Sequence, residues 1–159
     1  ARAIALGALS IDHLEAATPE DAAALGRSNT FAVVLPICGL HVDDRFANAR
    51  RLVDAGAPVC VATNSNPGSA PSTSVALAAA LAVRRAGLTP AEAITAITAN
   101  PAALLGLADR GSIEPGKRAD LVLLRHIDER ALVYELEADH ADVVIAGGVP
   151  VKGWPVHGR

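Results

Sequence analysis

The chain has 159 residues, of which 51% are hydrophobic and only 3% aromatic, and its formal net charge is −3. This length is enough for one domain with a core of small aliphatic side chains. The weak, evenly spread charge argues against a nucleic-acid or membrane-surface role, and no stretch is apolar enough to span a bilayer. Cys38 and Cys60 form no CxxC motif and no secreted-type framework. We therefore expect two buried thiols and a cytoplasmic location.

The first half of the chain predicts three successive strand–helix units. Capping residues mark the helix starts: Thr18 precedes Pro19 and two acids, and Ser74 precedes a long run of helix formers that Gly87 ends. The repeat of roughly 25 residues is typical of βα units in a parallel sheet. The strands are expected at residues 8–11, 31–35 and 59–63, and the helices at residues 19–25, 43–54 and 75–85.

The pattern changes after residue 88. Thr89 to Glu92 forms a capping box, so a helix is expected up to Asn100-Pro101 and a second short one at residues 102–105. A turn-rich segment, a strand at residues 119–124 and a hairpin at residues 143–151 follow. The sequence starts without Met inside a helical pattern, which indicates a fragment, and we place a domain boundary near residue 110.

The carboxyl ends of parallel strands are where α/β active sites form. The three predicted strands end at His13, at Pro36 with Cys38, and at Asn64 with Asn66, so these positions should converge. His13 can exchange protons near neutral pH or bind a metal, and Asp12 or Glu15 could fix its tautomer. The alternative is a structural histidine.

Three other residues are weaker candidates for chemistry. His41 is expected in a solvated loop after the second strand. Cys60 lies among apolar neighbours, which disfavour a thiolate. Cys38 has no adjacent base to activate it.

A polar loop separates the third strand from its helix. Residues 64–74 contain two amides, two prolines, a glycine and several hydroxyls. A loop that leads into a helix N-terminus favours an anionic or carbonyl-bearing ligand. The alternative is an ordinary βα connection, although so many polar residues exceed what a turn needs.

Several motifs resemble the imidazolonepropionase family of the amidohydrolase superfamily, and together they cover nearly the whole chain. The signature at residues 111–121 specifies only the superfamily, whereas Asn66-Pro67-Gly68-Ser69 after Ala62-Thr63 is much more specific. The other motifs are Asp12-His13-Leu14 and Leu88-Thr89-Pro90-Ala91-Glu92-Ala93.

The resemblance implies metal-dependent hydrolysis of 4-imidazolone-5-propionate to N-formimidoyl-L-glutamate in histidine degradation. It implies zinc or iron as cofactor, a small-molecule substrate and a homodimer. The implied fold is α/β, a TIM-like (β/α)8 barrel with a small β-sandwich. On that template the chain is similar to the C-terminal portion: residues 1–110 supply the last three βα units and closing helices, and residues 111–159 supply strands of the sandwich.

The resemblance also implies roles for individual residues. His13 matches a histidine that contacts the substrate and assists hydrolysis. Asn66 matches the residue that recognises the imidazolone ring, and Gly68 and Ser69 match the loop that holds the propionate carboxylate. Asn64 stands where the family has a metal-binding aspartate. Its amide coordinates only weakly and cannot accept a proton as a carboxylate does, so we expect weaker metal binding and turnover.

Two alternatives remain open. The family's other metal-binding histidines have no counterpart here, which favours an inactive fragment that binds ligand or associates without turnover. A related cyclic amidohydrolase or deaminase is the second alternative. The anion-binding loop argues against it, because a substrate without a carboxylate would not need that loop.

Overall fold

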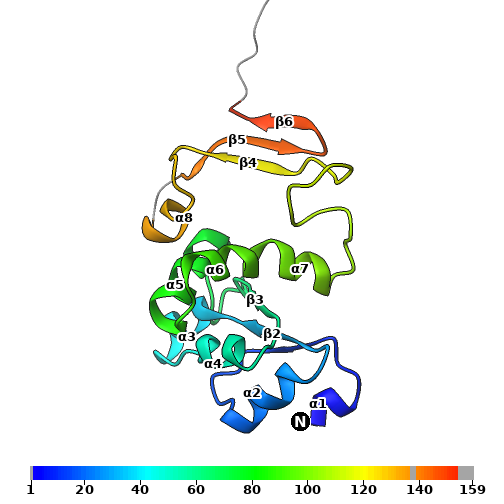
Figure 1. Ribbon diagram of the computed structural model, residues 1–159. Coiled ribbons are helices and arrows are strands. Elements are labelled where there is room, and N and C mark those ends of the chain that lie inside the picture. The colour runs from blue at the N-terminus through cyan, green and yellow to red at the C-terminus, as the bar shows by residue number, and fades with distance from the viewer. Residues whose placement is uncertain (1, 137–138, 154–159) are drawn as a thin grey trace, which may run out of the picture.

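The computed structural model describes residues 2–136 and 139–153, and it contains two three-stranded sheets (Figure 1). In the first sheet, the strands β1 (Ser10–Asp12), β2 (Phe31–Val34) and β3 (Val59–Val61) run parallel in the order β1-β2-β3. Helices connect the strands, so the predicted βα organisation is confirmed.

Helices cover one face of this sheet. Alternate strand residues point to opposite faces, and Val34, Val59 and Val61 contribute to the main core with residues of α2, α4, α5 and α6. Val33 and Cys60 form a smaller cluster on the other face. The helices are α1 (Arg2–Ala5), α2 (Pro19–Gly26), α3 (Pro36–Val42), α4 (Ala49–Asp54), α5 (Val75–Ala86), α6 (Pro90–Ile97), α7 (Ala99–Leu104) and α8 (Ala131–Tyr134).

The predicted helix caps are confirmed. The side chain of Thr18 accepts a hydrogen bond from the N–H of Asp21, and Thr89 accepts one from Glu92, each within a full capping box. Ser74 caps α5, and Gly87 ends it in the left-handed conformation (φ +84°). Local capping chemistry therefore sets where these helices begin and end.

Other boundaries were predicted wrongly. Pro36 begins α3 rather than only ending β2, since proline suits the first turn of a helix. His41 accordingly lies in α3 and not in a loop. The fourth helix begins six residues later than Asp43, because the side chain of Asn48 accepts the hydrogen bond of Arg51 N–H and caps it. The break between α6 and α7 falls at Thr98, three residues before Pro101.

An ion pair joins α4 to α6. The Nη1 atom of Arg50 lies 2.7 Å and 2.9 Å from the two carboxylate oxygens of Glu92. One of these oxygens also accepts hydrogen bonds from the N–H and hydroxyl of Thr89 at 2.8 Å. Glu92 therefore serves both the cap of α6 and the contact with α4.

A side chain of α7 forms a hydrogen bond with the outer edge of β3. The carbonyl of Pro58 and the N–H of Ala62 bond to β2, so the carbonyl of Val59 faces away from β2. The Nδ2 atom of Asn100, in α7, donates a hydrogen bond of 2.7 Å to this carbonyl oxygen.

The second sheet is antiparallel and contains β4 (Leu121–Leu124), β5 (Ala141–Ala146) and β6 (Val149–Lys152). Gly147 and Gly148 form the turn of the predicted hairpin, which is confirmed. Figure 1 shows α6 and α7 between the two sheets. Across both described ranges, no helix is long and apolar enough to cross a membrane.

Candidate active site at the strand ends

The chain segments that follow β1 and β3 leave the same edge of the parallel sheet. Asp12 is in register with Val33, and Val34 with Val61, so the carboxyl ends of the strands are aligned. Neighbouring strands are about 4.8 Å apart, which places β1 and β3 roughly 10 Å from each other. His13 and Asn64 thus begin from one edge, on either side of β2.

His13 is held by a carboxylate. Its Nδ1 atom lies 3.3 Å from Oε1 of Glu15, and 49% of its side chain is exposed. A carboxylate accepts hydrogen bonds, so this contact places the proton on Nδ1 and leaves Nε2 as the acceptor. Asp12, the other predicted partner, instead accepts a hydrogen bond from the Ser10 hydroxyl.

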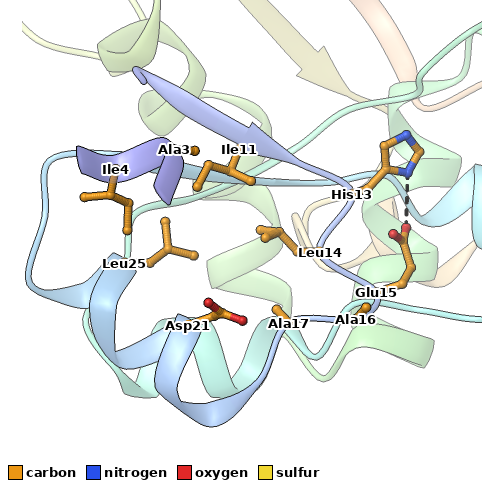
Figure 2. Close-up of a pocket in the computed structure, with 10 residues that line it drawn as sticks. All are labelled: Ala3, Ile4, Ile11, His13, Leu14, Glu15, Ala16, Ala17, Asp21 and Leu25. Atoms are coloured by element: carbon orange, nitrogen blue, oxygen red, sulfur yellow. Dashed lines mark hydrogen bonds and ion pairs between the residues drawn. The ribbon is translucent and has the colours of Figure 1, made fainter. Parts of the chain in front are cut away.

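A pocket of about 440 Å³ extends from His13 toward α1 and α2. Figure 2 shows His13 and Glu15 at one end of it and the apolar side chains of Ile4, Ile11 and Leu25 at the other. Neither Asn64 nor Asn66 lines this pocket. The pocket therefore lies on the helical side of β1, apart from the loop that follows β3.

Asn64 adopts a left-handed backbone conformation with φ of +52°. It is half-buried, and within the described ranges its side-chain amide makes no hydrogen bond. Its backbone carbonyl accepts a hydrogen bond of 2.7 Å from Nδ2 of Asn66. The amide of Asn64 is thus available at the end of β3.

The side chain of Asn66 is directed into its own loop. Oδ1 accepts hydrogen bonds from the N–H groups of Gly68 (2.9 Å) and Ser69 (2.8 Å), and Nδ2 donates to the Ser69 hydroxyl (3.0 Å). Sequence reasoning missed this network, although Asn before Pro-Gly is a signal for a side-chain-closed turn. The N–H groups of Gly68 and Ser69, in the loop predicted to hold a carboxylate, are thus already bonded to Asn66.

The cysteines are free, and neither has the surroundings of a nucleophile. Cys60 is 2% exposed, and burial raises the pKa of its thiol to about 11. Cys38 is half-buried, which corrects the prediction that both thiols are buried. It lies in the first turn of α3 and packs against the cluster that contains Cys60.

Comparison with known proteins gives the chain its family. A model of the amidohydrolase family matches residues 9–151. The chain belongs to the amidohydrolase family. It is 50% identical over 146 residues to an imidazolonepropionase of Deinococcus deserti, and 49% identical over 143 residues to one of Deinococcus radiodurans. These matches cover 92% and 89% of the chain but only 37% and 36% of the relatives.

Structural similarity supports the amidohydrolase fold. An adenosine deaminase from Xanthomonas campestris with bound zinc superposes with a TM-score of 0.79 at 23% identity. The match covers 89% of this chain and 36% of the deaminase. The chain therefore spans about a third of the length of the curated relatives and of this solved structure.

This amidohydrolase-family chain does not present a complete metal site in the residues that the structure describes. Outside the positions left undescribed, no group of three or more His, Cys, Asp or Glu side chains is placed to hold a metal ion. His13 is bonded to Glu15, and position 64 carries an amide. These residues do not fit a metal centre by themselves.

Proposed function

We propose that this chain is part of a cytoplasmic enzyme that hydrolyses 4-imidazolone-5-propionate to N-formimidoyl-L-glutamate in histidine degradation. The observation that carries the proposal is the 50% identity to the Deinococcus deserti imidazolonepropionase over 92% of the chain. The polar loop after β3 and His13 after β1, at one edge of the sheet, agree with it. We assign residues 1–110 to a TIM-like barrel and residues 111–159 to a β-sandwich.

The proposed reaction requires a group beside the ring that can accept and donate a proton. Water adds to the ring carbonyl carbon, the C–N bond of the ring breaks, and the departing nitrogen takes a proton. The Nε2 atom of His13 is suited to proton transfer, because the hydrogen bond to Glu15 keeps a proton on Nδ1, the other ring nitrogen. We therefore assign His13 to substrate contact and proton transfer.

We assign Gly68 and Ser69, in the loop after β3, to the propionate carboxylate, and Asn66 in the same loop to the imidazolone ring. Gly68 has no side chain, which leaves space for the ligand to approach the backbone. The hydroxyl of Ser69 lies 3.2 Å from Oδ1 of Asn66, the longest hydrogen bond to that oxygen. This hydroxyl can turn from Asn66 to a carboxylate at little cost.

The metal of the proposal, zinc or iron, requires ligands from outside the described residues, so no step is assigned to it. Asn64 is the position at which this chain would contribute to such a centre. An amide supplies a neutral oxygen where a carboxylate would supply a charge and a proton acceptor. Metal binding and turnover should therefore both be limited by Asn64.

The experiment compares the chain with its Asn64→Asp variant, each expressed alone and together with the remaining part of the Deinococcus deserti relative. Bound metal and loss of imidazolonepropionate are measured. We expect Asn64→Asp to raise both. Asn48→Asp is the matched control, since Asn48 caps α4 away from the strand ends and aspartate also caps helices well. Co-expressed samples in which no variant hydrolyses the substrate would contradict the proposal.

A further inference from the structure

We propose that Leu14 and Glu15 form a positioning unit for His13. Leu14 anchors the bend that follows β1, and Glu15, which the bend returns toward the imidazole, selects the tautomer of His13. The structural part of this inference stands on the geometry alone, whereas its catalytic consequence rests on the proposed function. Both residues act through His13 and need no contact with the substrate.

The chain bends sharply where β1 ends. His13 and Leu14 are consecutive residues with φ of +73° and +72°, a conformation that residues other than glycine rarely adopt. Two left-handed residues in a row coil the chain, whereas a strand would carry Glu15 further along its own direction. The bend therefore brings the carboxylate of Glu15 back beside the imidazole, and Figure 2 shows the two side chains facing each other.

Leu14 supplies the anchor for this bend. Its side chain packs against the main core of the protein. Its carbonyl oxygen accepts a hydrogen bond of 3.1 Å from the N–H of Ala17, which lies one residue before the cap of α2. A strained backbone persists only where its surroundings impose it, and these two contacts impose it here. Loss of the apolar anchor should therefore let the bend relax.

The side chain of Glu15 forms one hydrogen bond in the part of the chain that the structure describes, and its partner is His13. Oε1 of Glu15 lies 3.3 Å from Nδ1 of His13, and only 19% of the Glu15 side chain is exposed. An ionised carboxylate accepts hydrogen bonds and donates none, so the proton of the neutral imidazole has to lie on Nδ1. Nε2, which points away from Glu15 (Figure 2), then keeps its lone pair for a proton of the reaction.

Asp12, the other carboxylate beside His13 in the sequence, does not compete for the imidazole. It is the last residue of β1 and is in register with Val33 of β2. Its Oδ1 atom accepts a hydrogen bond of 3.1 Å from the Ser10 hydroxyl. The tautomer of His13 should therefore depend on Glu15 and on the bend that holds it, and not on Asp12.

Nuclear magnetic resonance of the ring nitrogens tests the structural part without turnover. At about pH 9, where an ordinary imidazole is neutral, the nitrogen chemical shifts show which ring nitrogen carries the proton. His13→Gln identifies the signals of His13 by their loss. We expect the proton on Nδ1 in the unchanged chain. Glu15→Ala should move it to Nε2, the form that exposed imidazoles favour, and Leu14→Ala should shift the population the same way because Glu15 is no longer held in place.

Asp12→Ala and Leu9→Ala are the matched controls. The first removes the neighbouring carboxylate, and the second shortens a leucine that is 73% exposed before β1. Both should keep the proton of His13 on Nδ1. Amides of β2 report whether each variant is folded. A proton on Nε2 in the unchanged chain, or one that stays on Nδ1 in folded Glu15→Ala, would overturn the inference. An unchanged tautomer in folded Leu14→Ala would overturn the role of the anchor.

Kinetics of the co-expressed, complete enzyme test the catalytic consequence. Proton transfer by a positioned side chain contributes on the order of 100- to 10,000-fold in rate. Glu15→Ala leaves His13 in place but favours the wrong tautomer, so kcat should fall by about 10- to 100-fold with little change in KM. An unchanged kcat despite a shifted tautomer would refute the catalytic role. Because the resonance measurements need no turnover, the positioning unit and the proposed function can fail independently.

Discussion

At the scale of single residues, three of the four non-glycine residues with positive φ in the described ranges follow strand ends, and the fourth, Asp44, follows α3. His13, Leu14 and Asn64 have φ values of +73°, +72° and +52°, although none is glycine. Each such conformation costs about 1–2 kcal/mol and persists only where the surroundings impose it, most often at functional sites. The backbone therefore independently marks the segments in which we place the site.

The cysteines should differ in reactivity. At pH 8 the thiol of Cys60 stays protonated, because burial raises its pKa to about 11, whereas Cys38 is partly accessible. We expect a thiol reagent to label only Cys38 in the folded chain and to label Cys60 after unfolding. Cys38→Ser should remove the first reaction and keep the second. Fast labelling of Cys60 in folded Cys38→Ser would contradict this burial.

Residue types in the sequence indicate which side chains are candidates for the site but not where those side chains point. His13 is predicted from its place after a strand, and so is a carboxylate partner, yet only the structure selects Glu15 over Asp12. Asn66 is predicted as a ligand for the substrate and is found bonded within its loop. Hydrogen-bond partners depend on side-chain direction, which spacing alone does not determine.

At the scale of elements, capping chemistry is what the sequence predicts best. Thr18, Ser74, Thr89 and Gly87 act locally, so their effects are visible without tertiary contacts. The helix predicted from residue 43 begins instead at Ala49, because the cap at Asn48 decides where α4 begins. Short helices such as α3 and α8 carry too few turns to show periodicity.

The Glu92 ion pair should make stability sensitive to acid. Hydrogen bonds from Arg50 and Thr89 lower the pKa of Glu92 from 4.5 to about 2. Below pH 4.5 the unfolded chain binds a proton that the folded chain does not, so stability falls as pH drops from 4.5 to about 2. In urea titrations, Glu92→Gln should flatten the pH dependence of the free energy of unfolding. At pH 7 it should lower that free energy by about 1 kcal/mol, after allowance for solvent screening.

Asp54→Asn provides the matched control for Glu92→Gln. Asp54 also pairs with Arg50, at 2.9 Å, but its side chain is 65% exposed. A surface pair of this spacing within a helix contributes about 0.3–0.5 kcal/mol, so the control should change stability far less. Equal losses of stability in Glu92→Gln and Asp54→Asn would contradict this. They would show that the bonds of Glu92 to the cap of α6 and to α4 contribute no additional stability.

At the scale of the whole molecule, one carboxylate ties the turn-rich segment to the second sheet. Asp120 accepts a hydrogen bond of 2.6 Å from the N–H of Gly147, in the β5–β6 turn, and its oxygens lie 2.9 Å from Nε of Arg118. The N–H of Gly148 donates to the carbonyl of Ala119 beside it. This contact fixes the hairpin against the start of β4.

Asp120→Ala should loosen the second sheet without affecting the first. Hydrogen exchange measured by mass spectrometry should rise about tenfold in peptides that contain the β5–β6 turn, since the N–H of Gly147 loses its charged hydrogen-bond partner. Peptides of β2 and β3 should keep their protection. Asp142→Ala, at an exposed position of β5, is the control. Uniform loss of protection in both sheets would show instead that they open as one unit.

The amide of Asn100 has a bearing on self-association. An edge strand with open carbonyls can template pairing with another chain, which is a route to aggregation. On β3 the carbonyl of Val59 is occupied by a side chain that another strand would first have to displace. Asn100 thus makes the outer edge of β3 a poorer template for another strand.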